Sequence, residues 1–461
     1  MSGRRLASSF RDPAGFMYVA DGTLFRQVNN AYRAHYDLLM HSGLYQALVA
    51  NEWLVPHEEV DRPAVSEAYR TLEPQTVPYV SYPYEWCFSQ LKDAALLTLD
   101  IQILSLSFGV VLKDASAYNV QFIGSRPVFI DTLSFETYED GAPWVAYRQF
   151  CEHFLGPLAL MAHCDVRLRQ LLGRFIDGVP LDLVANLLPL RTRARFGLLA
   201  HIHLHARSQE RHRDDAGSSQ PLRIPKLSKP RLLALMESLR AAVRGCRLPK
   251  RRSEWSDYYE ETNYSDEAML AKETLVRRLI EETAEPGGLI HDIGANTGRF
   301  SRLVAGPQRY VVSHDIDELA IEYNYREGRR LRSKAVLPLV LDLANPSPAI
   351  GWALEERSSA LERISGGTVL ALALVHHLAI SNNVPLPDLA ALFGRLAKTL
   401  IIEFVPKEDS QVRRLLATRK DIFPGYTLAA FEAAFSRVFE ITQRHAVPGT
   451  SRMLFAMRRH A

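Results

Sequence analysis

Short apolar runs alternate with longer amphipathic stretches through the second half of the chain. Between the runs, apolar residues recur three and four positions apart, a spacing that predicts helices. The runs themselves predict buried strands. The first begins at Leu289, the second ends at Asp315, and three more cover 335–343, 368–377 and 398–405. A hairpin at 439–459 follows them. This alternation predicts an α/β fold with a doubly wound, Rossmann-like sheet over 255–461, which binds its ligand at the carboxyl ends of the strands.

The first half of the chain has a different pattern. Residues 8–28 predict strands separated by two turns, residues 30–50 predict a helix, and a mostly apolar segment at 89–108 predicts a long buried helix. Further helices extend to residue 206. Strands followed by helices predict an α+β domain over 8–206, and a basic linker with one helix, at 207–254, joins it to the second domain.

The composition is that of an ordinary globular protein. The 461 residues are 47% hydrophobic and 23% charged, and the formal net charge is only +3, so nucleic acid is not an expected partner. No apolar run approaches the roughly 20 residues that a membrane span needs, and the N-terminus lacks the apolar core of a secretory leader. The four cysteines show no CxxC spacing, which favours reduced thiols in a cytoplasmic protein.

The stretch from Leu289 to Asp315 contains the most informative motif. A short strand leads into the turn Asp-Ile-Gly-Ala-Asn-Thr-Gly at 292–298, a helix follows, and a second strand ends in an acid. Glycines in such a turn let a ligand approach the backbone, and the terminal acid can accept both hydroxyls of a ribose. A dinucleotide site would carry three glycines. The turn resembles motif I of class I S-adenosylmethionine (SAM) methyltransferases, with Asn296 where many members have a glycine.

This resemblance implies a set of residues that bind SAM. In that family the acid after the second strand meets the ribose, and the residues that end the third strand meet the adenine. Carried over to this chain, the cofactor-binding residues are Asp292, Gly294, Asn296, Gly298, Asp315, Asp342 and Leu343. Asp315 is favoured over Asp317 for the ribose because Asp315 ends the strand, whereas Asp317 is placed to cap the next helix.

Two histidines, His376 and His377, lie where the fourth predicted strand ends. Methyl transfer from SAM is an in-line displacement, so the enzyme positions the nucleophile and removes its proton. Imidazole titrates near neutrality, and both residues are therefore candidates for the catalytic base, with His377 ahead of His376. The alternative is a purely structural role for both. No Asn/Asp-Pro-Pro-aromatic motif occurs at this point, which argues against an amino group of a nucleic acid base as the acceptor.

A second motif lies in the first half of the chain, where Asp114, Asn119 and Asp131 occur in LKDASAYNVQFIGSRPVFID. These residues resemble the catalytic loop and metal-binding segment of aminoglycoside and choline kinase-like phosphotransferases. The resemblance implies that Asp114 orients a hydroxyl, and that Asn119 and Asp131 hold Mg²⁺ for Mg-ATP. The lysine that grips the phosphates has no equivalent, since the first lysine of the chain is Lys92, and Arg26 is the candidate that stands in for it. A hairpin with two solvated acids is the alternative.

Longer stretches resemble a bacterial family that includes the nodulation protein NoeA. They are LKDASAYNVQF, PVFIDTLSFE, ALVHHLAISNNVPLP and IIEFVPKEDSQV, and the resemblance covers nearly the whole chain. It implies a link to nodulation and a saccharide-type acceptor. We therefore predict a SAM-dependent methyltransferase that methylates an oxygen of a small molecule or saccharide, preceded by a kinase-like domain that binds substrate or nucleotide. The alternatives are a bifunctional kinase–methyltransferase that acts on one acceptor, and a catalytically silent scaffold that binds SAM or ATP.

Overall fold

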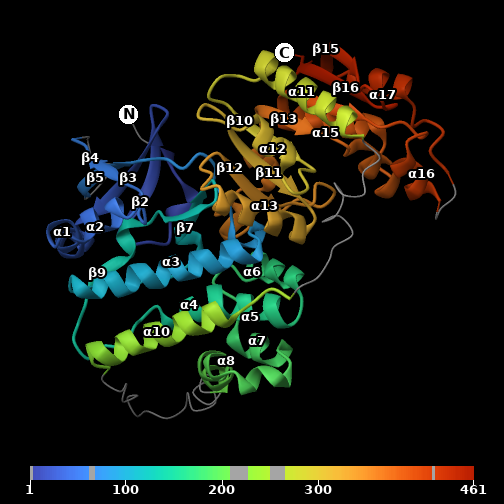
Figure 1. The fold of residues 1–461 in the computed structure, drawn as a ribbon. Helices are drawn as coiled ribbons and strands as arrows, with labels where there is room; N and C mark the ends of the chain where they lie inside the picture. Colours follow the sequence, from blue (N-terminus) through green and yellow to red (C-terminus); the bar gives the residue numbers. More distant parts are fainter. Residues whose placement is uncertain (1–3, 62–67, 208–226, 250–264, 418–420, 461) are drawn as a thin grey trace. The chain divides into compact units, whose positions relative to one another are not determined.

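The computed structural model describes residues 4–61, 68–207, 227–249, 265–417 and 421–460 (Figure 1). The chain divides into two compact units. Unit 1 contains residues 1–122, 127–250 and 350–357, and unit 2 contains residues 123–126, 251–349 and 358–461. The main boundary, at 250–251, falls inside the linker predicted at 207–254. Each unit also includes a short segment from the other half of the sequence.

Unit 2 is built on a seven-stranded sheet with the strand order β12-β11-β10-β13-β14-β16-β15. The strands are β10 (Leu289–Ile293), β11 (Tyr310–Asp315), β12 (Val336–Val340), β13 (Gly367–Ala371), β14 (Ala397–Phe404), β15 (Phe439–Ala446) and β16 (Met453–Arg459). The strands from β10 to β14 are parallel, whereas β16 runs antiparallel to both of its neighbours. The order reverses between β10 and β13, the point at which doubly wound sheets bind ligands. This arrangement confirms the predicted Rossmann-like sheet and adds one antiparallel strand, β16, between β14 and β15.

Helices cover both faces of this sheet. One face carries α14 (Ala360–Ile364), α15 (Leu386–Leu396) and α17 (Leu428–Phe435), and the other carries α11 (Asp266–Thr283) and α12 (Arg299–Val304). Alternate residues of one strand divide between the two cores, as Leu400 and Ile402 belong to one and Ile401 to the other. Burial on both faces explains why these strands read as unbroken apolar runs.

Unit 1 begins with a five-stranded antiparallel sheet in the order β1-β2-β3-β5-β4. Its strands are β1 (Arg4–Arg5), β2 (Gly15–Ala20), β3 (Thr23–Asn29), β4 (His57–Glu59) and β5 (Ala68–Pro74). The helix predicted at 30–50 is divided at Gly43, whose φ is +91°, into α1 (Arg33–His41) and α2 (Leu44–Ala50). Glycine adopts this left-handed conformation without steric cost, so it ends one helix and starts the next.

The rest of unit 1 is mainly helical. The long buried helix predicted at 89–108 is α3 (Phe88–Ser107). Two short ribbons follow it: β6 (Val110–Leu112) pairs with β9 (Phe135–Thr137), and β7 (Val120–Ile123) pairs with β8 (Arg126–Phe129). The residues of the kinase-like motif lie beside these strands: Asp114 and Asn119 between β6 and β7, and Asp131 between β8 and β9.

The helix predicted within the linker belongs to unit 1. α10 (Lys229–Gly245) packs against α3, where Arg240 pairs with Asp100 and Lys92 Nζ donates a hydrogen bond of 2.7 Å to the carbonyl of Cys246. Residues 208–226 and 250–254 of the predicted linker lie outside the described residues. Within the ranges that the structure describes, no helix is long and apolar enough to span a membrane.

Candidate functional site

The turn between β10 and α12 depends on left-handed backbone conformations. The φ angle is +81° at Gly294, +49° at Asn296 and +77° at Gly298. A Cβ atom at Gly298 would lie 2.3 Å from the side chain of Asn324, and one at Gly294 would lie 3.3 Å from Leu374 Cδ1. Both positions favour glycine for its conformation, and Gly298 also requires it for space.

Asn296 and Asp315 are joined across this turn. The backbone N–H of Asn296 donates to Asp315 Oδ2 at 2.7 Å, and the side-chain Oδ1 of Asn296 accepts from the N–H of Thr297 at 2.7 Å. Asn tolerates a left-handed φ better than most residues, which explains why it can replace a glycine here. The structure thus brings Asn296, the residue that departs from the usual glycine of the motif, into contact with Asp315, the candidate ribose acid.

Asp315 ends β11 and is partly buried. Its Oδ1 accepts from the N–H of Asp317 at 2.8 Å, and burial raises the pKa of the carboxyl to about 6. Each carboxylate oxygen offers two lone-pair positions, so the group can accept from a further donor besides the N–H groups of Asn296, Ile316 and Asp317. Two neighbouring hydroxyls, such as those of a ribose, match this arrangement. Asp317 instead caps α13 (Glu318–Arg330), where it accepts from the N–H groups of Leu319 and Ala320.

Ile316 is a neighbour of Asp315 that the sequence analysis did not single out. Its side chain is 59% exposed although it is large and aliphatic. An exposed apolar side chain beside the candidate ribose acid offers a contact for an adenine ring. The sequence signal is an apolar residue placed directly after the acid that ends a strand.

Asp292 lies beneath the turn and not at its surface. The residue is 1% exposed, and its carboxylate accepts a hydrogen bond of 2.5 Å from the Ser301 hydroxyl on α12. Burial raises the pKa of Asp292 to about 7, and the negative charge of Asp315 adds to the rise. Asp292 therefore connects β10 to α12 and supports the turn from below.

β12 ends earlier than the sequence predicted. The strand stops at Val340, and the N–H of Leu341 donates to the carbonyl of Asp315 at 2.8 Å. Asp342 then turns the chain, because its Oδ1 accepts from a backbone N–H two residues further on, at 2.9 Å. Leu343 is 7% exposed and packs into the core of unit 2. Asp342 thus stays at the carboxyl edge of the sheet, whereas the side chain of Leu343 is buried.

The two candidate histidines differ in environment. His376 is fully buried, and within the described part of the chain neither of its ring nitrogens has a hydrogen-bond partner. His377 is half-buried and begins a π-helix, η11 (His377–Ser381). Burial, and then the positive charge of Arg452, lowers the pKa of His377 to about 4. His377 is therefore neutral at physiological pH, and it is the more exposed of the two histidines.

A network of buried charges lies near these histidines. Glu403, on β14, accepts from Lys272 Nζ on α11 at 2.7 Å, and Arg452 Nη1 lies 3.8 Å from Glu403 Oε1. Arg452 also donates from Nε to Asp409 at 2.7 Å. Glu403 Oε2 accepts a further hydrogen bond, of 2.8 Å, from the N–H of Ala373. This network joins residues that are far apart in the sequence, and its signal there is a glutamate inside the otherwise apolar strand IIEFV.

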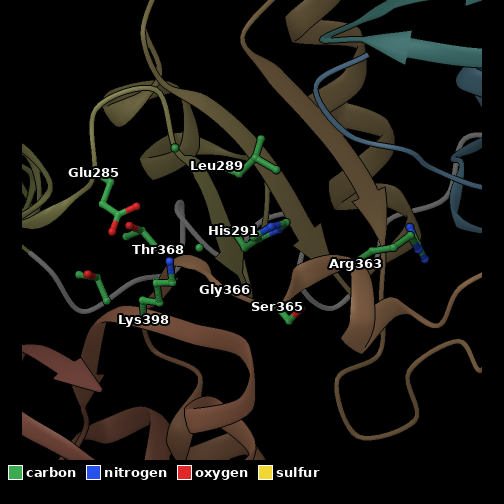
Figure 2. Close-up of a pocket in the computed structure, with 11 residues that line it drawn as sticks. Glu285, Leu289, His291, Arg363, Ser365, Gly366, Thr368 and Lys398 are labelled. Carbon is green, nitrogen blue, oxygen red and sulfur yellow. The ribbon is translucent and has the colours of Figure 1, made fainter. Parts of the chain in front are cut away.

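A separate cavity of about 200 Å³ lies at the opposite edge of the sheet (Figure 2). Its lining comes from the amino ends of β10, β13 and β14, and it includes Glu285, His291, Arg363 and Lys398. Burial lowers the pKa of His291 to about 3, and its Nδ1 lies 3.1 Å from Nε2 of His314 on the adjacent strand. None of the residues predicted to bind SAM lines this cavity.

In unit 1 the three kinase-like candidates lie in one cluster. Asn119 Nδ2 donates to Ser134 Oγ at 3.1 Å, and the Ser134 hydroxyl in turn donates to Asp131. Asp114 accepts from the backbone N–H of Ser116 at 2.9 Å. Burial raises the pKa of Asp114, and the negative charge of Asp131 adds to that rise.

Arg26 neutralises part of this cluster. Its Nη2 lies 2.5 Å from Asp131 Oδ1 and 3.4 Å from Asp12 Oδ2. A Mg²⁺ ion held by Asn119 and Asp131 would compete with this guanidinium, so the arrangement fits an internal cation better than a bound metal. Across the described ranges, His, Cys, Asp and Glu side chains form no group of three that could hold a metal ion.

No protein-family model matches the sequence. Over 467 aligned residues the chain is 36% identical to the nodulation protein NoeA of Rhizobium meliloti (strain 1021). The alignment covers 99% of this chain and 96% of that protein. Among solved structures, the N-methyltransferase NodS of Bradyrhizobium japonicum WM9 shares 12% identity over 43% of this chain and 99% of its own, with a TM-score of 0.31. The magnesium protoporphyrin IX methyltransferase of Synechocystis PCC 6803 shares 18% identity over 45% of this chain and 93% of its own, with a TM-score of 0.32. The strand order of unit 2, rather than these structural matches, establishes its fold.

Proposed function

The chain belongs to the family of the nodulation protein NoeA, and on this premise we propose that unit 2 is a SAM-dependent methyltransferase that acts on an oxygen of a small-molecule or saccharide acceptor. The observation that carries the proposal is the carboxyl edge of the sheet, where Asp315 is bonded to the glycine turn at 294–298. The link of the relative to nodulation favours a saccharide as the acceptor.

The residues at this edge fit SAM. When bound, SAM supplies an electrophilic methyl group on a positively charged sulfur. Asp315 would accept hydrogen bonds from the ribose hydroxyls, and Ile316 would contact the adenine. Gly294 and Gly298 leave the backbone free of side chains where the ligand approaches. SAM has no phosphate, and a turn with two glycines and the polar Asn296 suits it better than a pyrophosphate.

His377 orients the acceptor in this proposal. A neutral imidazole with a pKa of about 4 would accept a hydrogen bond from the acceptor hydroxyl, and it would take the proton as the oxygen–carbon bond forms and the carbon–sulfur bond breaks with release of S-adenosylhomocysteine. The low pKa makes His377 a weak base, so its main contribution is the alignment of the nucleophile. His376 supports it, because the two ring centroids are 4.1 Å apart and His376 is held in the core.

Calorimetric titration of the whole chain with SAM tests this function. We expect saturable binding at one site, and methyl transfer from isotope-labelled SAM to a member of a saccharide panel. The absence of SAM binding would contradict the proposal whatever the acceptor.

We further infer that unit 1 is a kinase-like domain that binds substrate or nucleotide. The support is the cluster of Asp114, Asn119 and Asp131, together with an antiparallel sheet that precedes a mainly helical part. The ion pair between Arg26 and Asp131 favours binding without phosphoryl transfer. A bifunctional enzyme that phosphorylates and methylates one acceptor is the alternative.

A second titration, with Mg-ATP, separates these two roles. Binding that is lost in Asp131→Asn would support a working nucleotide site and the bifunctional enzyme. If ATP at millimolar concentration neither binds nor shifts the unfolding temperature, the bifunctional enzyme is excluded. If neither SAM nor ATP binds, a scaffold for other ligands becomes the better explanation.

A further inference from the structure

Ala373 has a backbone conformation that a residue with a Cβ atom does not favour. Its φ is +49°, in the left-handed region. The residue lies two positions after the end of β13 and four positions before His377, so the chain turns from the sheet toward the candidate acceptor site at this point. A contact from outside the segment is needed to hold such a conformation, since local sterics oppose it.

Glu403 provides that contact. Its fully buried carboxylate accepts from the N–H of Ala373 at 2.8 Å through the same oxygen, Oε2, that accepts from Lys272 Nζ at 2.7 Å. A buried carboxylate is costly unless it is paired, and the ammonium of Lys272, itself 2% exposed, supplies the opposite charge. Oε2 of Glu403 therefore accepts from a buried cation and from the backbone N–H of Ala373 at the same time.

The segment held in this way touches both halves of the candidate site. Leu374, the next residue, lies against Gly294 of the glycine turn, where its Cδ1 would be 3.3 Å from an added Cβ atom. The carbonyl of Leu374 accepts from the N–H of His377 at 3.0 Å. A shift of Ala373 would therefore move both the glycine turn at Gly294, which is the candidate cofactor site, and His377, which is the candidate acceptor site.

We propose that Glu403 is a positioning residue of the methyltransferase site: its carboxylate holds Ala373 and thereby aligns the glycine turn with His377. The inference rests on the proposed methyltransferase function for the meaning of the site, but the hydrogen bond itself is independent of that function. Glu403 does not touch the ligands, because it is fully buried.

Two double variants isolate the hydrogen bond from the ion pair. Lys272→Met with Glu403→Gln removes both charges and keeps an acceptor oxygen for the Ala373 N–H. Lys272→Met with Glu403→Leu removes both charges and the acceptor. Arg452 retains its partner Asp409 in both variants. Calorimetry with SAM and hydrogen exchange of the peptide that covers 372–378, read by mass spectrometry, are compared between them.

We expect the glutamine variant to bind SAM within about threefold of the wild-type affinity, and the leucine variant to bind about tenfold more weakly and to exchange at 372–378 about tenfold faster. Exchange elsewhere in unit 2 should be equal in the two variants. Adding Ala373→Gly to the leucine variant relieves the backbone strain, and it should bring the SAM affinity to within about threefold of that of the glutamine variant.

Equal SAM affinity and equal exchange in the two double variants would overturn the inference. If the leucine variant does not fold, the triple variant that also carries Ala373→Gly is measured in its place. If the triple variant is unfolded as well, Glu403 supports the whole of unit 2 and not this segment, which would also overturn the inference. If wild-type protein does not bind SAM, the proposed function fails, while the exchange contrast still decides the role of Glu403.

Discussion

Changing Asp315 to alanine is expected to remove most of the SAM affinity of unit 2. In the proposed complex the carboxylate accepts one hydrogen bond from each of two ribose hydroxyls. A hydrogen bond to a charged group contributes about 1.5–3 kcal/mol, so the loss of two weakens binding by about 3–6 kcal/mol, or about 10²–10⁴-fold. The upper part of this range is expected, because the N–H groups of Asn296 and Asp317 also lose their acceptor and the turn is released.

The raised pKa of Asp315 adds a pH signature to this prediction. With a pKa of about 6, the carboxyl is mostly ionised at neutral pH and takes up a proton as the pH falls through 6. Protonation converts one acceptor into a donor, so SAM affinity should fall with pH below this value, by up to about tenfold per unit. Folding stability changes with pH in the opposite direction. Between the ordinary value of 3.8 and about 6 the folded state binds the proton more tightly than the unfolded chain, so Asp315 lowers stability as the pH rises.

Asp317→Asn is the matched control for this experiment. Asparagine caps a helix as well as aspartate does, so α13 should stay intact and SAM affinity should remain within about threefold of wild type. Calorimetry at neutral pH and at pH values on either side of 6 measures all three proteins. Wild-type affinity in Asp315→Ala, or an equal loss in Asp317→Asn, would refute the assignment of Asp315 to the ribose.

Three further changes test other parts of unit 2. Lys272→Met leaves the carboxylate of Glu403 buried without its ammonium partner and should lower the free energy of unfolding by about 3–5 kcal/mol in urea, whereas a loss below about 1 kcal/mol would contradict the burial of the pair. Gly298→Ala places a Cβ 2.3 Å from Asn324 at a φ of +77°, so SAM binding and thermal stability should both fall; unaltered melting would show that the turn can relax. His377→Ala should keep SAM affinity and lower turnover by about 10²-fold or more, and retained turnover would exclude it from the reaction.

The sheet of unit 2 could be predicted from the sequence because its strands are buried on both faces and therefore appear as apolar runs between amphipathic helices. The glycine turn and its proximity to Asp315 could also be predicted from the sequence, since both lie in one continuous stretch whose backbone conformation depends on neighbouring residues. Unit 1 is harder for the opposite reason. Arg26 reads as a stand-in for a lysine, but its pairing with Asp131 depends on how β3 is placed against a loop more than a hundred residues later.

Long-range pairing also explains what the sequence could not show in unit 2. Lys272 and Glu403 are 131 residues apart, and only the fold joins them. His376 and His377 are adjacent, so no pattern decides which of them is buried. That choice depends on the left-handed Ala373 and on the π-helix that follows, neither of which has a sequence signature as strong as a glycine.

The position of β16 has a consequence for how the protein is made. Of the strands in the described ranges this one comes last in the sequence, yet it lies between β14 and β15 in the interior of the sheet. During synthesis β15 therefore emerges before the strand it must pair with, and one edge of the apolar β14 stays open until β16 is available. Open apolar edges invite pairing with other chains, and pairings between distant segments form slowly. We expect the yield of native protein to depend on chaperone protection during this interval more than on the stability of the finished fold.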